Sequence, residues 1–357
     1  MSTAPPAEVD LEISPRARFD VIDVNERIEE RHGDLLQQYP RILYFSYHTT
    51  AGYLEQSLSS RLNGGKEGLQ PYMQVFQTLF PEGADYRHDQ IHLRDELSAE
   101  QKVDEPRNAD SHLAFIGAGL RTCVTYKNRP GEPVYFIDLD GMNAGKPRRR
   151  LTSVVGYHHE EVVARTSLEV PVSGHPVDSI NLKDPATGLY AHINELARRH
   201  GVGHGRVVVS LAAHERQAGL TVNEYETLLM THDLAEVLRD PLRFMAEKGR
   251  SMLADPRAIP HRSIEYAKYD LVRVINRLME RLGMSESIAE SLLARMLAVG
   301  ADRFLRMKRK VSLLVADRDG GGPGAIVQGS YQSPILVQWA KSAHHARRLD
   351  ITLTRFA

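Results

Sequence analysis

The sequence predicts an α+β fold of two tandem domains, each a mostly antiparallel β-sandwich with flanking helices. An apolar, strand-like run at residues 41–46 leads into the turn HTTAG, and a similar run at residues 206–211, about 165 residues later, leads into a second turn ending in Ala-Gly. A repeat at this spacing indicates a duplicated domain, because solenoid repeats are much shorter. The last strand-like runs are short and joined by glycine-containing turns. They should therefore pair antiparallel, since a parallel sheet would need helical crossovers that are missing.

Length and composition are those of an ordinary globular protein. The 357 residues suffice for two domains, and 45 Lys+Arg against 46 Asp+Glu leave a net charge of −1. This balance favours neither nucleic acid nor an anionic membrane as a partner. No apolar run reaches the ~18 residues that a membrane span needs. The single cysteine, Cys123, excludes an internal disulfide, predicts a core position and fits a reducing, cytoplasmic location.

The first half carries the clearer pattern. Residues 1–18 contain three prolines and predict a flexible lead-in, and residues 19–160 form the first predicted domain. A short strand near Phe19 precedes a helix that Asp23 or Asn25 could cap. A second helix is expected at residues 66–80, with Pro71 in its first turn. Three further strand-like runs lie between turn residues, at 120–127, 134–139 and 151–157.

The second predicted domain, residues 161–357, restates this order and is expected to be more helical. A strand at 167–172 and a helix at 191–200 precede the repeated strand. Helical spacing of apolar residues and a strand-rich end follow. The expected helices are 223–248, 264–282 and 285–307, and the expected strands are 311–316, 326–328, 335–339 and 349–354.

Several short motifs together resemble one known family. The first half has HTTAG, followed by Tyr86-x-His88 and Asp110-x-His112, and the second half has Asn223-Glu224 and GSYQ at 329–332. This set is similar to the YjbQ family, also called the secondary thiamine-phosphate synthase family, once in each half. The resemblance implies a seven-stranded sandwich with two helices in each domain, and a homo-oligomer.

Each half departs from the family pattern in a different way. The first half has Gln56-Ser57 where the family has Asn-Glu, whereas the second has Glu215 at the histidine position. A gapless comparison puts Arg303 opposite His112, and His261 is a candidate for the Tyr-x-His histidine. Because each half keeps largely what the other lacks, we hypothesise one composite site assembled from both halves.

The resemblance assigns the residues of this site. Histidines and carboxylates are the types that acid–base or divalent-metal chemistry needs. The predicted catalytic residues are His48, His88, Asp110, His112 and Glu224. The predicted substrate-binding residues are Thr49, Thr50, Asn223, Tyr331 and Gln332, with Tyr331 as a stacking surface. A metal, Mg²⁺ or Zn²⁺, would be held by His48, His88 and His112.

Other interpretations of these residues stay open. Residues 49–52 could simply form a tight turn, or their N–H groups could bind a phosphate. Asp110 and His112 point the same way only in an extended chain, because on a helix they diverge. The resemblance implies a thiamine-phosphate-synthase-like transferase and a small phosphorylated partner. The alternatives are a non-catalytic ligand-binding or assembly protein and a metal-dependent hydrolase.

Overall fold

The computed structural model describes residues 4–62, 64–239, 244, 307–318 and 322–357. It divides into two compact units. Unit 1 comprises Met1–Leu58, Leu120–Tyr225 and Met307–Ala357, and unit 2 comprises Ser59–Gly119 and Glu226–Arg306. Among the described residues, no helix is long and apolar enough to span a bilayer.

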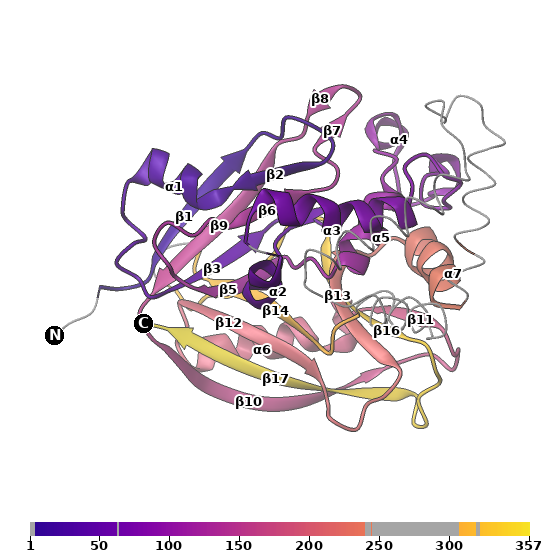
Figure 1. The fold of residues 1–357 in the computed structure, drawn as a ribbon. Coiled ribbons are helices and arrows are strands. Elements are labelled where there is room, and N and C mark those ends of the chain that lie inside the picture. The colour runs from indigo at the N-terminus through magenta and orange to yellow at the C-terminus, as the bar shows by residue number, and fades with distance from the viewer. Residues whose placement is uncertain (1–3, 63, 240–243, 245–306, 319–321) are drawn as a thin grey trace, which may run out of the picture. The chain divides into compact units, whose positions relative to one another are not determined.

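The first half of the chain contributes two antiparallel sheets to unit 1 (Figure 1). Its larger sheet has the order β1-β9-β3-β5, and its smaller sheet has the order β2-β6-β4. The large-sheet strands are β1 (Ala7–Ile13), β9 (Arg150–Tyr157), β3 (Arg41–Ser46) and β5 (Cys123–Lys127). The small-sheet strands are β2 (Asp20–Asp23), β6 (Tyr135–Asp138) and β4 (Ala51–Gly52).

The second half repeats both sheets in the same strand order. Its larger sheet runs β10-β17-β12-β14 with β15 added at the edge, and its smaller sheet runs β11-β16-β13. The strands are β10 (Glu160–Pro171), β17 (Ala346–Phe356), β12 (His204–Leu211), β14 (Lys310–Ala316), β15 (Ala325–Val327), β11 (Asp178–Asn181), β16 (Gln332–Gln338) and β13 (Ala218–Glu224). This order is what a tandem duplication would produce, and the duplication itself stays a prediction.

The repeat extends to the pairing of single residues. Ala51 pairs with Asp138 at the end of β6, and Ala218 pairs with Gln338 at the end of β16. Glu215 therefore stands three residues before Ala218, just as His48 stands three residues before Ala51. Two isolated β-bridges also correspond. Tyr53, two residues after Ala51, pairs with Arg121, and Leu220, two residues after Ala218, pairs with Lys308.

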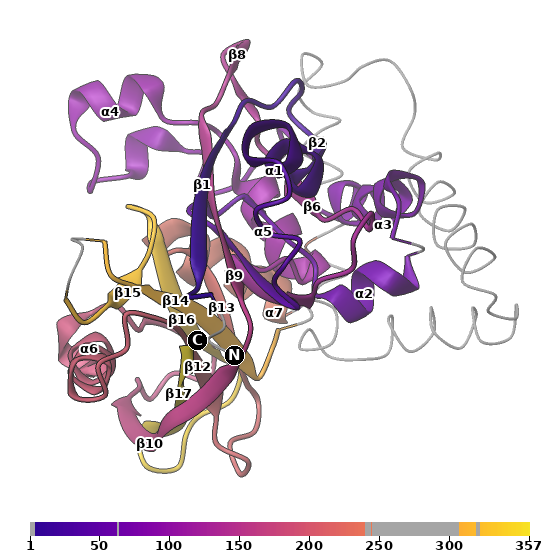
Figure 2. The same ribbon diagram turned by 90° about the vertical axis from the view of Figure 1, so that its left-hand side faces the viewer.

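Each pair of sheets encloses its own core, so each half is a sandwich. In the first half, Ile42 and Tyr44 of β3 pack with residues of both sheets and with helix α1 (Val24–His32). In the second half, both sheets pack with helix α6 (Leu189–Arg199), which lies beside β15 and β17 (Figure 2). Apolar burial of this kind is the main favourable term in folding.

A third core joins the two halves within unit 1. Leu43 and Phe45 point away from Ile42 and Tyr44, because successive side chains of a strand alternate between its faces. They pack with Cys123 of the first half and with apolar residues of the second half, including Leu314. Tyr157 and Phe356 stack at 3.9 Å between ring centroids. Burial on both faces explains why β3 is a continuous apolar run, and the predicted core position of Cys123 is confirmed.

The start of the chain differs from the prediction. Residues 7–13 of the predicted flexible lead-in form strand β1, which pairs with β9 along its whole length. Val9, Leu11 and Ile13 are buried, and the residues between them are more exposed. The predicted cap of α1 is confirmed, because the Asp23 carboxylate accepts hydrogen bonds from the N–H groups of Asn25 and Glu26.

Unit 2 is built from two insertions at matching points of the halves. One insertion separates β4 from β5, and the other separates β13 from β14. The first begins in α2 (Gln56–Arg61) and contains α3 (Lys66–Leu79), the 3₁₀ turn η1 (Ile91–Leu93), α4 (Ala99–Asp104) and α5 (Ala109–Ala118). The second contains a π-helical turn, η3 (Leu229–Asp233), followed by α7 (Leu234–Arg239). Short elements elsewhere are β7 (Met142–Asn143), β8 (Lys146–Pro147) and η2 (Pro185–Thr187).

Two helix predictions need correction. Helix α3 begins at Lys66, so Pro71 lies in its second turn and not in its first. The helix predicted over 223–248 begins later, because Asn223 and Glu224 continue strand β13. Residues 264–282, His261 and Arg303 lie outside the described residues, as does nearly all of 285–307.

Each sandwich contains one buried arginine at the same place. Arg150 starts β9 and donates to both carboxylate oxygens of Asp138, at 2.7 and 2.8 Å, and to the carbonyl of Asp140. Arg347 near the start of β17 donates in the same way to the Gln338 side chain, at 3.1 Å, and to the carbonyl of Ala340.

The anion that balances the guanidinium differs between the halves. Asp138 supplies it in the first half, whereas Gln338 is neutral in the second. There Glu215 pairs with Arg347 at 2.8 Å instead. A buried guanidinium needs such a partner, because an unpaired buried charge is costly.

We predict that Arg347→Met lowers the free energy of unfolding by about 3–5 kcal/mol, because it leaves the Glu215 carboxylate buried without its cation. Urea unfolding followed by circular dichroism measures this change. Arg348→Met is the matched control, since the Arg348 side chain is 49% exposed. Adding Glu215→Gln to Arg347→Met should restore part of the loss, and equal stability of Arg347→Met and the control would contradict the assignment.

Candidate functional site

The structure places the predicted site residues in both units. His48, Thr49, Thr50, Asn223, Glu224, Tyr331 and Gln332 belong to unit 1, and His88, Asp110 and His112 belong to unit 2. Each group is described within its own unit.

In unit 1, His48 is held as a neutral ring. Its Nε2 atom accepts a hydrogen bond from the backbone N–H of Leu151 at 2.7 Å, so the ring proton must be on Nδ1. Burial, followed by the charges of Arg150 and Arg148, lowers the pKa of His48 to about 3. Among the described residues, none accepts a hydrogen bond from Nδ1–H. His48 is therefore a fixed neutral donor near physiological pH, and not a base.

The turn that carries His48 is fixed by residues of the second half. The buried amide of Gln332 donates to the carbonyls of Ser46 and His48, at 2.7 and 3.0 Å. The buried amide of Asn223 donates to the carbonyl of Thr49 at 3.3 Å. Both amides come from paired strands, because Glu224 of β13 faces Gln332 of β16. The two halves thus meet at this turn.

A glycine makes this close approach possible. A Cβ atom on Gly329 would lie 1.9 Å from the backbone oxygen of Tyr47, a distance that no side chain tolerates. The GSYQ motif thus contacts the first half in two ways. The backbone of Gly329 packs against the backbone of Tyr47, and the side-chain amide of Gln332 donates to the carbonyls of Ser46 and His48. Tyr331 between them is 65% exposed, so its role as a stacking surface stays a prediction.

Within the turn, most polar groups are paired and two N–H groups are not. The Ser46 hydroxyl donates to the carbonyl of Ala51 and accepts from the N–H of His48. Leu139 donates to the carbonyl of Thr50. The N–H groups of Thr49 and Thr50 have no acceptor among the described residues. Donors of this kind, in a turn, are suited to binding an anion.

In unit 2, His88 belongs to a buried polar network. Its Nδ1 atom lies 2.9 Å from the carboxylate of Asp89, and its Nε2 atom lies 3.4 Å from Nη1 of Arg94. An ionised carboxylate only accepts, so Nδ1 carries the proton and the Nε2 lone pair faces the guanidinium. Burial, followed by the charge of Arg94, lowers the pKa of His88 to about 3. His88 is thus also neutral.

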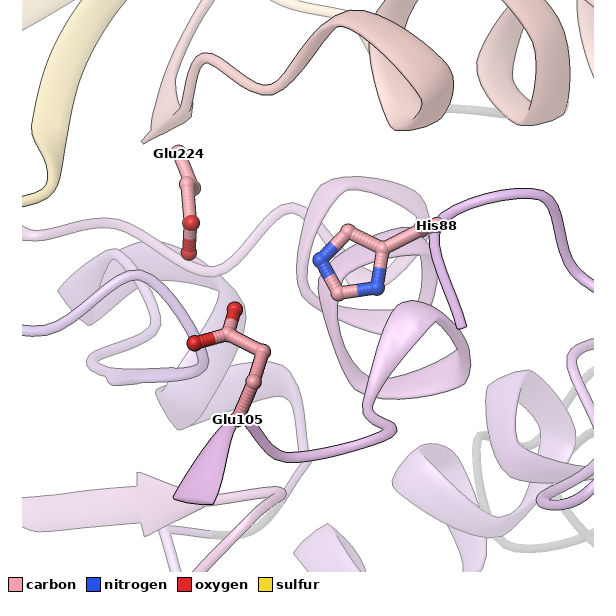
Figure 3. Close-up of side chains that lie close together, drawn as sticks. All are labelled: His88, Glu105 and Glu224. Carbon is pink, nitrogen blue, oxygen red and sulfur yellow. The ribbon is translucent and has the colours of Figure 1, made fainter. Parts of the chain in front are cut away.

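Arg94 links this histidine to two glutamates. Its guanidinium donates to Glu105 at 2.5 Å and to Glu96 at 2.6 Å, and its side chain is 2% exposed. Glu105 and His88 are both drawn in Figure 3, and a ligand atom of one lies within 4.8 Å of a ligand atom of the other. Glu224, also drawn there, ends β13 in unit 1.

Asp110 and His112 lie on the first turn of α5, so they do not belong to an extended segment in which their side chains would point the same way. The helix directs their side chains apart. The His112 ring lies 5.3 Å from the His88 ring, centroid to centroid, and both histidines are fully buried. Burial, followed by the charges of Asp110, Asp89 and Asp233, raises the pKa of Tyr86. Unit 2 therefore brings together the predicted His88, Asp110 and His112.

Sequence reasoning missed part of this cluster. Asp89 directly follows His88, and that adjacency could have identified it. Asp233 gave no such signal: it lies on the second insertion, and its carboxylate accepts hydrogen bonds from the N–H groups of Arg87 and His88, at 2.9 and 3.0 Å. Arg94 and Glu105 carry charges in an ordinary polar stretch, and only the burial of the Arg94 side chain distinguishes this pair from other surface charges.

Two of the three predicted metal ligands, His48 and His88, do not fit the predicted metal. A metal ligand must offer an unused lone pair. The Nε2 lone pair of His48 accepts from Leu151, and that of His88 faces Arg94, which also binds Glu105. A guanidinium thus stands where a cation would bind to His88 and Glu105. We derive no chemistry through Mg²⁺ or Zn²⁺.

Comparison with known proteins gives a likeness of fold. The sequence matches no family model and no curated protein. The chain resembles YjbQ-like structures. A YbjQ-like protein of unknown function from Sulfolobus solfataricus is 14% identical, with 55% of this chain and 99% of that one covered at a TM-score of 0.29.

Two further structures give similar values. A hypothetical protein from Aeropyrum pernix is 17% identical, with 54% and 98% of the chains covered and a TM-score of 0.28. An uncharacterised YjbQ/UPF0047-family protein from Clostridium acetobutylicum is 14% identical, with 54% and 99% covered and a TM-score of 0.26. At these values the likeness carries no weight for the site or the activity.

We predict that His48 and His88 stay neutral, with the proton on Nδ1, down to about pH 4. Nitrogen chemical shifts of the imidazoles, followed by NMR against pH, report both properties. Both pKa values lie near 3 in the folded protein, below the ordinary 6.5, so only the unfolded chain takes up these protons between the two values. Stability should fall as the pH falls through this window, by about 1.4 kcal/mol per pH unit for each histidine.

His48→Gln should remove the His48 share of this slope, because glutamine does not titrate. A His48 resonance that titrates near pH 6.5 would contradict the assigned hydrogen bond from Leu151.

Proposed function

We propose that this protein binds a small phosphorylated molecule through the turn His48–Gly52 of unit 1. The observation that carries the proposal is the neutral His48 ring, whose Nδ1–H has no acceptor among the described residues. The N–H groups of Thr49 and Thr50 add two more donors from adjacent residues. Three such donors in one turn suit the oxygens of a phosphate.

The surroundings of the turn support the same ligand class. Arg148 lies close enough to lower the pKa of His48, and its side chain is 30% exposed. The buried amides of Gln332 and Asn223 hold the turn by its carbonyl groups, so its N–H groups are left for a ligand. A rigidly held turn loses little conformational entropy when a ligand binds.

We expect inorganic pyrophosphate to bind to the full-length chain, measured by isothermal titration calorimetry at low salt. His48→Gln keeps an acceptor for the Leu151 N–H and removes the Nδ1 donor, so it should weaken binding about tenfold, or about 1.4 kcal/mol. His48→Asn keeps a donor near the Nδ1 position and should bind more tightly than His48→Gln.

Arg148→Met should also weaken binding, whereas Arg129→Met, whose side chain is 56% exposed, serves as the matched control. The proposal fails if the wild-type protein does not bind pyrophosphate, or if His48→Gln binds as well as the wild type.

A transferase reaction like that of thiamine-phosphate synthase is the finer proposal at the same turn. In that reaction a thiazole nitrogen attacks a pyrimidine carbon and diphosphate leaves. Neutral N–H donors stabilise such a leaving group electrostatically. The alternative is a ligand-binding or assembly protein that uses the same donors without chemistry. A metal-dependent hydrolase has less support, because the lone pairs of His48 and His88 already have hydrogen-bond partners.

Diphosphate release from the pyrimidine diphosphate, in the presence of the thiazole phosphate, separates the two roles. Release by the wild type that His48→Gln slows would support the transferase. Pyrophosphate binding without any release would support the non-catalytic role. The homo-oligomer implied by the family resemblance stays a separate prediction.

A further inference from the structure

Strand β10 is an edge strand that leaves a row of backbone groups without a partner in unit 1. It lies at the end of the large sheet of the second half, beside β17 (Figure 1). Just beyond the strand, Val172 donates to the carbonyl of His345, the residue that it faces. Because hydrogen-bonded pairs alternate along an antiparallel ladder, the backbone groups of Arg165, Ser167 and Glu169 point away from β17.

A bulge and a proline mark the ends of this free edge. The register with β17 shifts between Val162 and Ala164, and residues 164–170 then pair with β17 without a break. Pro171, which follows, has no N–H group to donate. Bulges and prolines limit pairing at a sheet edge. The stretch open to a further strand is therefore 164–170.

Other edge strands of unit 1 are capped by side chains of the same unit. The Gln56 side chain accepts from the N–H of Lys127 in β5 and donates to its carbonyl, both at 3.0 Å. The Asn194 side chain accepts from the N–H of Ile326 in β15 at 3.2 Å. In the part of the chain that the structure describes, no side chain binds the backbone of residues 164–170 in this way. Their outer edge is a template for another strand.

The charges of this stretch are complementary to themselves. Arg165 and Glu169 are exposed, and neither forms an ion pair with a described residue. If two copies of β10 pair antiparallel with Ser167 on the two-fold axis, Arg165 of each copy faces Glu169 of the other. Moving the axis by one residue puts Arg165 opposite Ser167 or Pro171 instead. Opposite charges that face each other across two strands stabilise the pair.

The matching edge of the first half lacks this property. Ile13 of β1 faces the buried Arg150, as Val170 of β10 faces the buried Arg347. By this match, the three outward positions of β1 all carry carboxylates, which would face one another and repel in a pair of β1 strands. These residues are Glu8, Asp10 and Glu12. Two of them are also used within the chain, where they bind Arg318.

We propose that β10 pairs antiparallel with β10 of a second copy of this chain, with Ser167 on the two-fold axis. The outward backbone groups of Arg165, Ser167 and Glu169 would then exchange hydrogen bonds between the copies, and two sheets would become one. A two-fold contact uses the same surface on both copies, so it closes at a dimer. The surface lies in the second half, and the proposal does not depend on the phosphate-binding turn of the first.

Sedimentation velocity of the full-length chain at increasing concentration tests the proposal. The wild type should form a dimer. Arg165→Glu and Glu169→Arg each place like charges opposite one another on both sides of the axis, so each should weaken the dimer about tenfold. Arg129→Glu, which makes the same change of charge at an exposed site, is the matched control and should dimerise as the wild type does.

Mixing the two weakened variants tests the register. In the mixed dimer, two carboxylates of one chain face two guanidinium groups of the other, so the mixture should dimerise about as tightly as the wild type. A mixture that associates no better than either variant alone would overturn the register and the proposal with it.

Ser167→Pro tests the backbone pairing. It removes an N–H group at the axis that does not bond to β17, so the variant should fold, as circular dichroism checks, and should stay monomeric. Glu12→Pro, at an outward position of β1, is its control and should dimerise. Hydrogen exchange of the amides of Arg165, Ser167 and Glu169 should slow as the dimer forms. A monomeric wild type would overturn the proposal, as would a Ser167→Pro variant that dimerises like the wild type.

Discussion

The buried guanidinium at the end of each sandwich is the interaction on which the loops around it depend. Arg150 and Arg347 occupy matching positions and bind the same backbone carbonyl position, two residues after the end of the partner strand. Because each needs an anion, a change at Asp138 must be matched elsewhere, as Glu215 matches the neutral Gln338. Arg150 also contacts the Thr50 hydroxyl at 3.4 Å, so the constraint reaches the turn that carries His48.

The two halves are interdependent within unit 1. Strand β3 buries Ile42 and Tyr44 in the sandwich of its own half, and Leu43 and Phe45 in the core shared with the other half. The amides of Gln332 and Asn223 then hold the turn that follows β3. A single half would expose the shared core to water and leave the turn without these hydrogen bonds. Packing between the halves and the geometry of the candidate site are therefore coupled.

Local patterns in the sequence predicted the fold where a single residue or a short run of residues determines the structure. The apolar run of β3, the Asp23 cap of α1 and the closing strands are of this kind. Strand β1 was missed because Pro5, Pro6 and Pro15 surround an alternating segment of only seven residues. The family resemblance named the residues that meet at the turn and predicted that Asn223 and Gln332 bind substrate, but it did not predict their hydrogen bonds to the turn. Gln332 and Asn223 bind the backbone, a role that depends on strand pairing far apart in the sequence.

The cluster in unit 2 was less accessible to such reasoning. His88 and His112 were identified from motifs, yet the neutrality of His88 follows from burial and from Arg94, which no short pattern reveals. The contact of Asp233 with His88 joins two insertions 145 residues apart. A sequence gives no local reason for a carboxylate to lie there. The strands between the two insertions, β5 to β13, bring Asp233 and His88 together.

That separation has a consequence for biosynthesis. A ribosome delivers the helices of the first insertion long before Asp233 emerges, so the backbone groups of Arg87 and His88 must wait for their acceptor while β5 to β13 are made. Contacts of high sequence separation form slowly, because a large loop must close first. Unit 2 therefore cannot complete its folding until Asp233 has emerged, and unit 1 waits longer still, because it needs β14 to β17 from the end of the chain. Intermediates that expose such unpaired groups are the ones that most need a chaperone.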